Sequence, residues 1–138
     1  MLGFGFLRIR IKDNEMKSYT DIEQSRKLTE ILPPESADMY YYSYMSIGEP
    51  FYMSYPNVIE DRQRLAKNDI PCWSLTAMLE VLPILDNRSP VIPKTFDGKY
   101  RAIYHSTAYE KAICTSDYDN PVDACYEMII KLHDSNLL

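Results

Sequence analysis

Three stretches of the chain have the spacing of apolar residues that is typical of packed helices. The most apolar is Pro71–Pro83, which lies between two prolines and contains the only Trp. Ser74 is a suitable N-cap because its hydroxyl can accept from the free N–H groups of the first turn, and Pro83 disfavours helical geometry in the residue before it. A helix over 74–82 is apolar nearly all round, so we expect other elements to cover it on several sides.

The second helix is predicted over 21–32. Thr20 and Glu23 have the spacing of a capping box, in which each side chain satisfies the backbone N–H of the other residue. Pro33 and Pro34 end the helix. The polar Ser25 interrupts its narrow apolar face, which consists of Ile22, Leu28, Ile31 and Leu32.

The third helix is predicted over 120–134. Asn120 is a favourable N-cap, and Pro121 occupies the first helical position, where its missing N–H costs nothing. Asp123 places a negative charge near the positive end of the helix dipole. The apolar positions recur at helical spacing and predict a buried stripe, formed by Val122, Cys125, Met128, Ile129 and Leu132.

A period of two marks the aromatic stretch 39–45, which predicts a strand. Tyr40, Tyr42 and Tyr44 fall on one face, and Met39, Tyr41, Ser43 and Met45 fall on the other. Methionine adapts its shape to an irregular core, so we expect the face with Met39 to point inward. Residues 51–55 form a second short strand, and 57–67 fit either a polar helix or a loop.

A three-stranded meander is predicted near 92–115. Asp97-Gly98 is a strong hairpin signal that pairs 92–96 with 99–105, and a turn near Ser106-Thr107 leads to 109–115. The middle strand alternates between two sets, with Tyr100, Ala102 and Tyr104 on one side and Arg101, Ile103 and His105 on the other. Together these elements predict an α+β fold: a small, mainly antiparallel sheet packed with the three helices.

The first fifteen residues differ from the rest. Residues 1–12 alternate weakly and carry Arg8, Arg10 and Lys12 without an acid, which fits a short strand or a basic tail. Met16-Lys17 opens a more conventional N-terminus. We therefore divide the chain into residues 1–15, interpreted as an upstream extension of the reading frame, and a single α+β domain over 16–138.

Charge and length narrow the function classes. The chain has 138 residues and a net charge of −5, and because residues 1–12 contribute three cations the remainder carries −8. Proteins that bind nucleic acid usually carry a surface cluster of Lys and Arg. The acidic balance of this chain argues against such a surface, so we do not expect a nucleic-acid partner. No apolar run approaches the roughly 18 residues of a membrane span. At the start the charges follow the apolar residues, the reverse of a signal peptide, so we expect a cytoplasmic protein without a membrane partner.

The residues that could act in catalysis or bind a metal do not form a recognisable motif. The chain has an odd number of cysteines, Cys72, Cys114 and Cys125. Each lies among apolar residues, and their spacing is not that of a metal site, so we interpret them as free buried thiols. His105 and Cys114 fall on neighbouring strands, but a turn at Ser106-Thr107 leaves them out of register and no third group orients the imidazole. The acidic run Asp117, Asp119 and Asp123 lacks the Gly and the distant Glu of an EF-hand. The sequence assigns no catalytic residue, no metal site and no cofactor.

The tyrosines on one face of the stretch 39–45 are the candidate binding residues: Tyr40, Tyr42 and Tyr44. Tyrosine offers contact area at low entropic cost and is enriched at interfaces, and an exposed aromatic patch usually marks a partner surface. The competing interpretation is a strand whose tyrosine face packs under a helix.

Three segments together carry a family resemblance: S-A-D-M-Y-Y-Y (36–42), P-C-W-S-L-T-A-M-L-E-V-L-P (71–83) and D-N-P-V-D-A-C-Y-E-M-I-I-K-L (119–132). Over roughly residues 16–138 the chain resembles uncharacterised small proteins encoded by phages, prophages and mobile elements of gut bacteria. The last segment is also similar to phage domains described as α–β–α sandwiches. The resemblance implies an origin and a fold, and it implies no activity.

Three function classes follow. The first is a non-enzymatic binding or accessory protein of phage or mobile-element origin that engages a protein partner or a second copy of itself. The second is an enzyme with an unrecognised cysteine- or carboxylate-based site, for which Cys72 or Cys114 would be the first candidate. The third is a nucleic-acid-binding accessory protein that uses the basic segment 1–12. A cleft that holds a cysteine beside a histidine or carboxylate would favour the enzyme.

Overall fold

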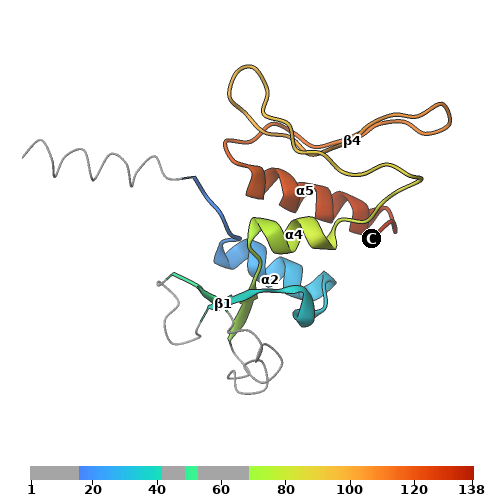
Figure 1. The fold of residues 1–138 in the computed structure, drawn as a ribbon. Helices are drawn as coiled ribbons and strands as arrows, with labels where there is room; N and C mark the ends of the chain where they lie inside the picture. Colours follow the sequence, from blue (N-terminus) through green and yellow to red (C-terminus); the bar gives the residue numbers. More distant parts are fainter. Residues whose placement is uncertain (1–15, 42–48, 53–68) are drawn as a thin grey trace, which may run out of the picture.

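The computed structural model describes residues 16–41, 49–52 and 69–138. The helices in these residues are α2 (Ile22–Ile31), α4 (Leu75–Val81) and α5 (Pro121–Asp134), and Figure 1 shows them between two small sheets. One sheet contains strand β1 (Met39–Tyr41) and lies at the α2 side, and the other contains strand β4 (Ile103–Tyr104) and covers α5. The predicted α+β class and the places of its three helices are confirmed.

Helix α2 begins one residue later than predicted. Asp21 is its N-cap, and the capping box joins Asp21 to Gln24 rather than Thr20 to Glu23. The Thr20 side chain is fully buried and has other partners: its Oγ1 accepts from the backbone N–H of Trp73 at 3.1 Å and lies 2.8 Å from Ser25 Oγ. Thr20 therefore ties the start of α2 to the chain before α4.

Helix α4 is capped as predicted, since Ser74 Oγ accepts from the N–H of Ala77 at 3.2 Å. Ala77 and Met78 are buried, but Leu79 is 43% exposed. The expectation that this helix is covered on several sides is therefore wrong. One of its faces packs against α5 and a short 3-10 turn η1 (Pro34–Ser36), while the opposite face stays open.

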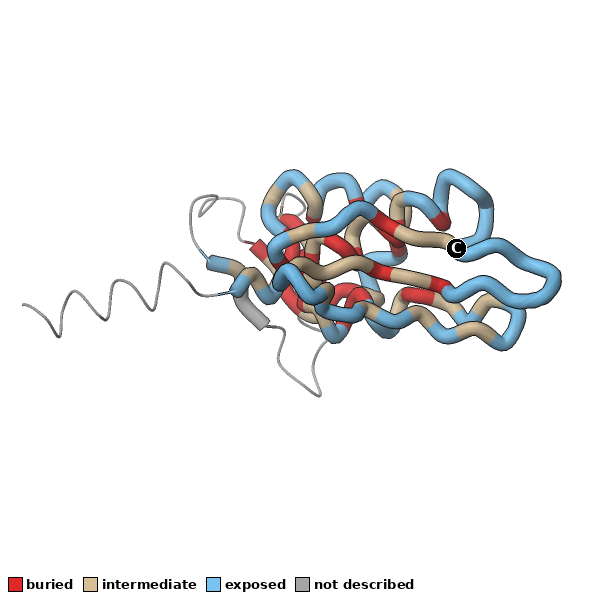
Figure 2. The backbone as a smooth tube through the Cα atoms, turned by 90° about the horizontal axis from the view of Figure 1, so that it is seen from above, coloured by how far each residue is buried: buried red, intermediate tan, exposed pale blue. Residues whose placement is uncertain are grey.

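Helix α5 confirms its prediction in full. Asn120 Oδ1 accepts from the N–H of Asp123 at 2.8 Å, and Pro121 opens the helix. The predicted stripe is buried together with Ala124, and it forms the main core with the helices α2 and α4. Figure 2 shows buried stretches through the interior of the molecule and exposed loops at its periphery.

The first sheet has the order β2-β1-β3, with strand β2 (Phe51–Tyr52) and strand β3 (Ile70–Cys72) antiparallel to β1. The sequence-based expectations include no strand at 70–72, where Pro71 only opens the apolar stretch that predicts α4. Here Pro71 lies on an edge strand opposite Tyr40, where a missing N–H is tolerated. Met39 and Tyr41 are buried, as expected for the inward face.

The second sheet is the predicted meander. Strand β4 pairs with strand β5 (Ile113–Cys114), and single bridges extend it: Val91 with Ile103, Lys94 with Tyr100 and Tyr100 with Tyr118. Ala102 and Tyr104 are buried, in agreement with the predicted alternation. The second turn differs: the register of Tyr104 opposite Ile113 centres it on Ala108-Tyr109 and not on Ser106-Thr107.

Candidate functional site

The tyrosines predicted to form a binding surface are described only in part. Tyr40 lies on β1 between β2 and β3 and is half-buried. Tyr42 and Tyr44 lie outside the described residues, as do residues 1–15 and the segment 57–67. A role of Tyr40, Tyr42 and Tyr44 in binding therefore stays a prediction.

Cys72 lies at the centre of a buried polar cluster. Its thiol donates to the Thr20 carbonyl at 3.4 Å, and the hydroxyl of Tyr41 donates to the same carbonyl at 2.7 Å. Burial raises the pKa of both the Cys72 thiol and the Tyr41 hydroxyl. Because the thiolate and not the thiol is the nucleophile, this cluster fits a structural role: it joins β1, β3 and the start of α2.

The other two cysteines differ from each other. Cys125 is fully buried on α5, and burial raises its pKa to about 12. Cys114 is half-buried, so the expectation of three buried thiols is wrong for this position. Cys114 pairs with Ile103 across the meander and not with His105, and its thiol donates to the Thr115 carbonyl at 3.3 Å. The described contacts bring no imidazole to a cysteine.

The acidic run is neutralised by cations from other segments. Asp117 pairs with Arg101 at 2.8 Å, Asp119 pairs with Lys99, and Asp123 pairs with Lys17 at 2.9 Å. For Asp123, burial opposes ionisation, but hydrogen bonds from Lys17, Gln24 and Asn120 outweigh it and lower the pKa. In the described part of the chain no group of three His, Cys, Asp or Glu is placed to hold a metal ion.

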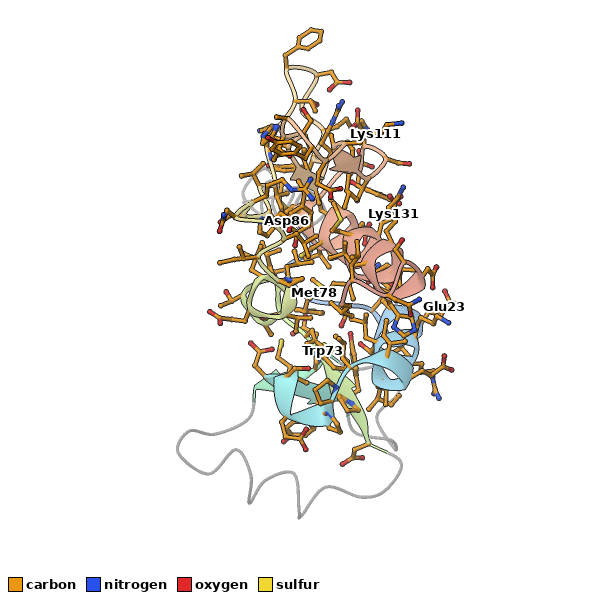
Figure 3. The ribbon with its side chains drawn as sticks, turned by 90° about the vertical axis from the view of Figure 1, so that its right-hand side faces the viewer. Glu23, Trp73, Met78, Asp86, Lys111 and Lys131 are labelled. Carbon is orange, nitrogen blue, oxygen red and sulfur yellow. The ribbon has the colours of Figure 1, made fainter. Side chains whose placement is uncertain are left out.

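Two of the grooves that described residues line are candidate binding sites. The first, which we call the edge groove, has a volume of about 610 Å³ and is lined by residues 84–86 and 88, residues 109–113, and Leu137. Three large apolar side chains around it are exposed: Ile84 by 70%, Tyr109 by 96% and Leu137 by 43%. Figure 3 labels Asp86 and Lys111, which come from its two facing walls.

One wall of the edge groove is a tight turn. Leu85 and Arg88 exchange two backbone hydrogen bonds, at 3.0 and 2.8 Å, around Asp86 and Asn87, whose φ angles are +47° and +63°. Asp and Asn adopt this left-handed geometry more readily than other residues with a side chain. The Arg88 guanidinium then donates to the carbonyls of His105 and Lys111, both at 3.1 Å. Arg88 thus fixes the turn against the meander.

The other wall is the edge of the meander. The N–H of Thr115 donates to the Ala102 carbonyl at 3.0 Å, and Ile113 is the partner of Tyr104 in the same ladder. Alternate residues of an antiparallel strand direct their backbone groups to opposite sides. Ala112 and Cys114 therefore direct theirs away from β4, along the outer edge. Farther along, the Glu127 carboxylate accepts from the N–H of Ser116 at 3.1 Å and covers the edge there.

The second groove, which we call the acidic groove, has a volume of about 580 Å³. The ends of α2, α4 and α5 and the turn η1 form it. Its apolar walls include Ile31, Val81 and Pro83, its acidic residues are Glu35 and Glu80, and His133 also lines it. No sequence signal identifies the residues of either groove as binding residues, because exposed apolar residues scattered through loops and helix ends have no recognisable pattern.

No known protein family, curated protein or solved structure matches this chain. Within the described residues, none of the helices is long and apolar enough to cross a membrane.

Proposed function

We propose that this protein is a non-enzymatic binding protein that holds an extended segment of a partner protein in the edge groove, as an added strand beside β5. The observation that carries the proposal is the outward-facing edge at Ala112 and Cys114, which lies next to three exposed apolar side chains. Main-chain hydrogen bonds to an exposed strand provide affinity in this mode of recognition, and adjacent pockets for alternate side chains provide specificity.

The size and composition of the edge groove favour a short extended peptide. In a strand, side chains on one face recur about every 6.6 Å, so two or three of them fit along the open stretch. Ile84, Leu85 and Ile113 offer them an apolar surface, and Tyr109 is exposed at the rim. Asp86, Glu110 and Lys111 give that rim charges of both signs. This arrangement suits an apolar peptide better than a polyanion.

The chemistry of the thiols supports binding over cysteine-based catalysis. Cys72 and Cys125 are buried with raised pKa values, and neither the edge groove nor the acidic groove is lined by a cysteine. A phage or mobile-element origin remains a proposal that rests on the resemblance of residues 16–138 alone.

The test uses a defined probe. Peptides are selected from a displayed library of random 12-residue sequences on the full chain, and the affinity of a selected peptide is measured by calorimetry. Tyr109→Ser removes an exposed aromatic anchor, and anchors of this kind contribute about 2 kcal/mol or more. Ala112→Pro removes an outward N–H that the contact with β4 does not use. Each should weaken binding by at least about tenfold.

Phe96→Ser is the matched control, because Phe96 is fully exposed at the other hairpin of the meander. It should leave the affinity unchanged. Hydrogen exchange should also slow at Ala112 and Cys114 when peptide is added. Peptides that bind equally well to all three variants would show that the protein does not use the edge groove, as would a failure to select any peptide.

A further inference from the structure

We propose that residues 1–12 of a second copy of the chain bind in the acidic groove, so that two copies associate by exchanging these segments. The inference is independent of the edge groove. It rests on the charges of the acidic groove, on the sequence of residues 1–12, and on the distance between the groove and residue 16.

The acidic groove is a preformed feature. Ser36 of η1 accepts from the indole N–H of Trp73 at 2.9 Å and donates to the Pro33 carbonyl at 2.6 Å. Trp73 is fully buried, and Figure 3 shows it between the first sheet and the helices. The wall that carries Glu35 is therefore anchored to the core, and a ligand meets a surface that needs little rearrangement.

The charges of the groove are not balanced locally. Glu35 and Glu80 are both exposed, and within the described residues no cation pairs with either carboxylate. Among the described residues that line the groove there is no Lys or Arg. A complementary ligand carries cations spaced among aliphatic side chains: the cations meet the two carboxylates, and the aliphatic groups meet Ile31, Val81 and Pro83.

Residues 7–12 have this composition. The sequence L-R-I-R-I-K alternates an aliphatic residue with a cation three times and contains no acid. In an extended segment Leu7, Ile9 and Ile11 share one face, toward the apolar walls. Arg8, Arg10 and Lys12 have long side chains whose charged ends can return to the rim of the groove. Arginine is particularly suited to a carboxylate because its planar group donates two parallel hydrogen bonds.

The chain geometry favours a second copy over the same chain. Lys17 pairs with Asp21, the N-cap of α2, at 3.0 Å, whereas Ile31 and Leu32 at the other end of this helix line the acidic groove. Ten helical residues are about 15 Å long. The five steps from Lys12 to Lys17 span at most about 18 Å when fully extended, so the segment of the same chain would use its entire linker to reach the near edge. The segment of a second copy has no such limit, and reciprocal exchange gives a closed dimer.

The test uses two variants of the full chain, one with the charges of the acidic groove reversed and one with the charges of residues 8–12 reversed. The groove-reversed variant carries Glu35→Lys and Glu80→Lys, and the segment-reversed variant carries Arg8→Glu, Arg10→Glu and Lys12→Glu. Sedimentation velocity measures self-association. Each variant alone should associate at least about tenfold more weakly than the unchanged chain, because like charges then face each other in both grooves of the dimer. Mixed together, the two variants should form a dimer of wild-type affinity, because both contacts are again complementary.

The matched control is Glu23→Lys with Glu30→Lys, which changes the net charge of the chain as much as the groove reversal does and alters exposed residues of α2 outside the groove. It should keep the association of the unchanged chain. Association should also weaken between about 0.05 and 1 M salt, where the screening length shortens severalfold. An unchanged chain that stays monomeric at every concentration would overturn the proposal. So would two variants that fail to associate when mixed, or a control that is weakened equally.

Discussion

Replacing Trp73 by Ala should remove the largest single contribution to the core. The side chain is fully buried, and its indole N–H donates to Ser36 Oγ at 2.9 Å. An aromatic side chain buries about 200 Å², which at roughly 25 cal/mol per Å² corresponds to about 5 kcal/mol. This is an upper value because the unfolded chain already covers part of that surface. We therefore expect a loss of about 3–5 kcal/mol.

The assay is urea unfolding followed by circular dichroism, with two matched variants. Trp73→Phe keeps one aromatic ring but loses the hydrogen bond to Ser36, which contributes about 1 kcal/mol, so its loss should lie below that of the Ala variant. Leu79→Ala changes a partly exposed side chain on the adjacent helix α4 and should lose less than about 1 kcal/mol. A Trp73→Ala loss no larger than that of Leu79→Ala would refute this account of the core. Native Trp fluorescence that is already red-shifted would refute it as well.

Three further predictions concern the thiols, the pH dependence and the tyrosines. A thiol reagent should label Cys114 first in the native protein, and Cys72 and Cys125 only on unfolding, because burial keeps both protonated; rapid native labelling of Cys125 would contradict the packing of α5. The lowered pKa of Asp123 means that its ionised form stabilises the fold above the unfolded pKa of about 3.9, and this contribution is lost as the pH falls through the folded pKa. The melting temperature should therefore fall more steeply below about pH 4 in the unchanged chain than in Asp123→Asn. If the melting temperatures of the two proteins fell equally with pH, the ion pair with Lys17 would not contribute to stability. A triple Tyr40, Tyr42, Tyr44→Ser variant should stay folded by circular dichroism and, if these tyrosines form a partner surface apart from the two grooves, keep its affinity for the selected peptide while losing a protein that the unchanged chain retains in a pull-down; unfolding would place these tyrosines in the core.

Helix ends could be predicted from the sequence where the signal lies within one helical turn. Ser74 caps α4 and Asn120-Pro121 opens α5 as expected, because a cap depends on neighbouring residues only. The start of α2 could not be predicted in the same way. Both Thr20 with Glu23 and Asp21 with Gln24 fit the capping-box spacing, and the choice depends on the backbone N–H of Trp73, which is 53 residues away in the chain.

Long-range pairing also explains the other differences. Pro71 makes strand β3 look implausible in isolation, and only its place on the edge of the first sheet makes it acceptable. The second turn of the meander is fixed by the pairing of Ile103 with Cys114 and not by the local sequence at Ser106-Thr107. Leu79 is apolar like its buried neighbour Met78, and the packing of α4 against α5 decides which of the two is covered.

The two outer edges of the meander show why the candidate site depends on topology. Val91 exchanges both backbone hydrogen bonds with Ile103, so Pro90 beside it occupies an outward position on the first edge. Proline has no N–H to offer, and this is a known means of blocking strand addition. The opposite edge has Ala112 and Cys114 at its outward positions, and Glu127 covers it at Ser116. Proline protects the edge at Val91, whereas the edge at Ala112 and Cys114 has no proline. This difference favours β5 as the strand beside which a partner strand would be added.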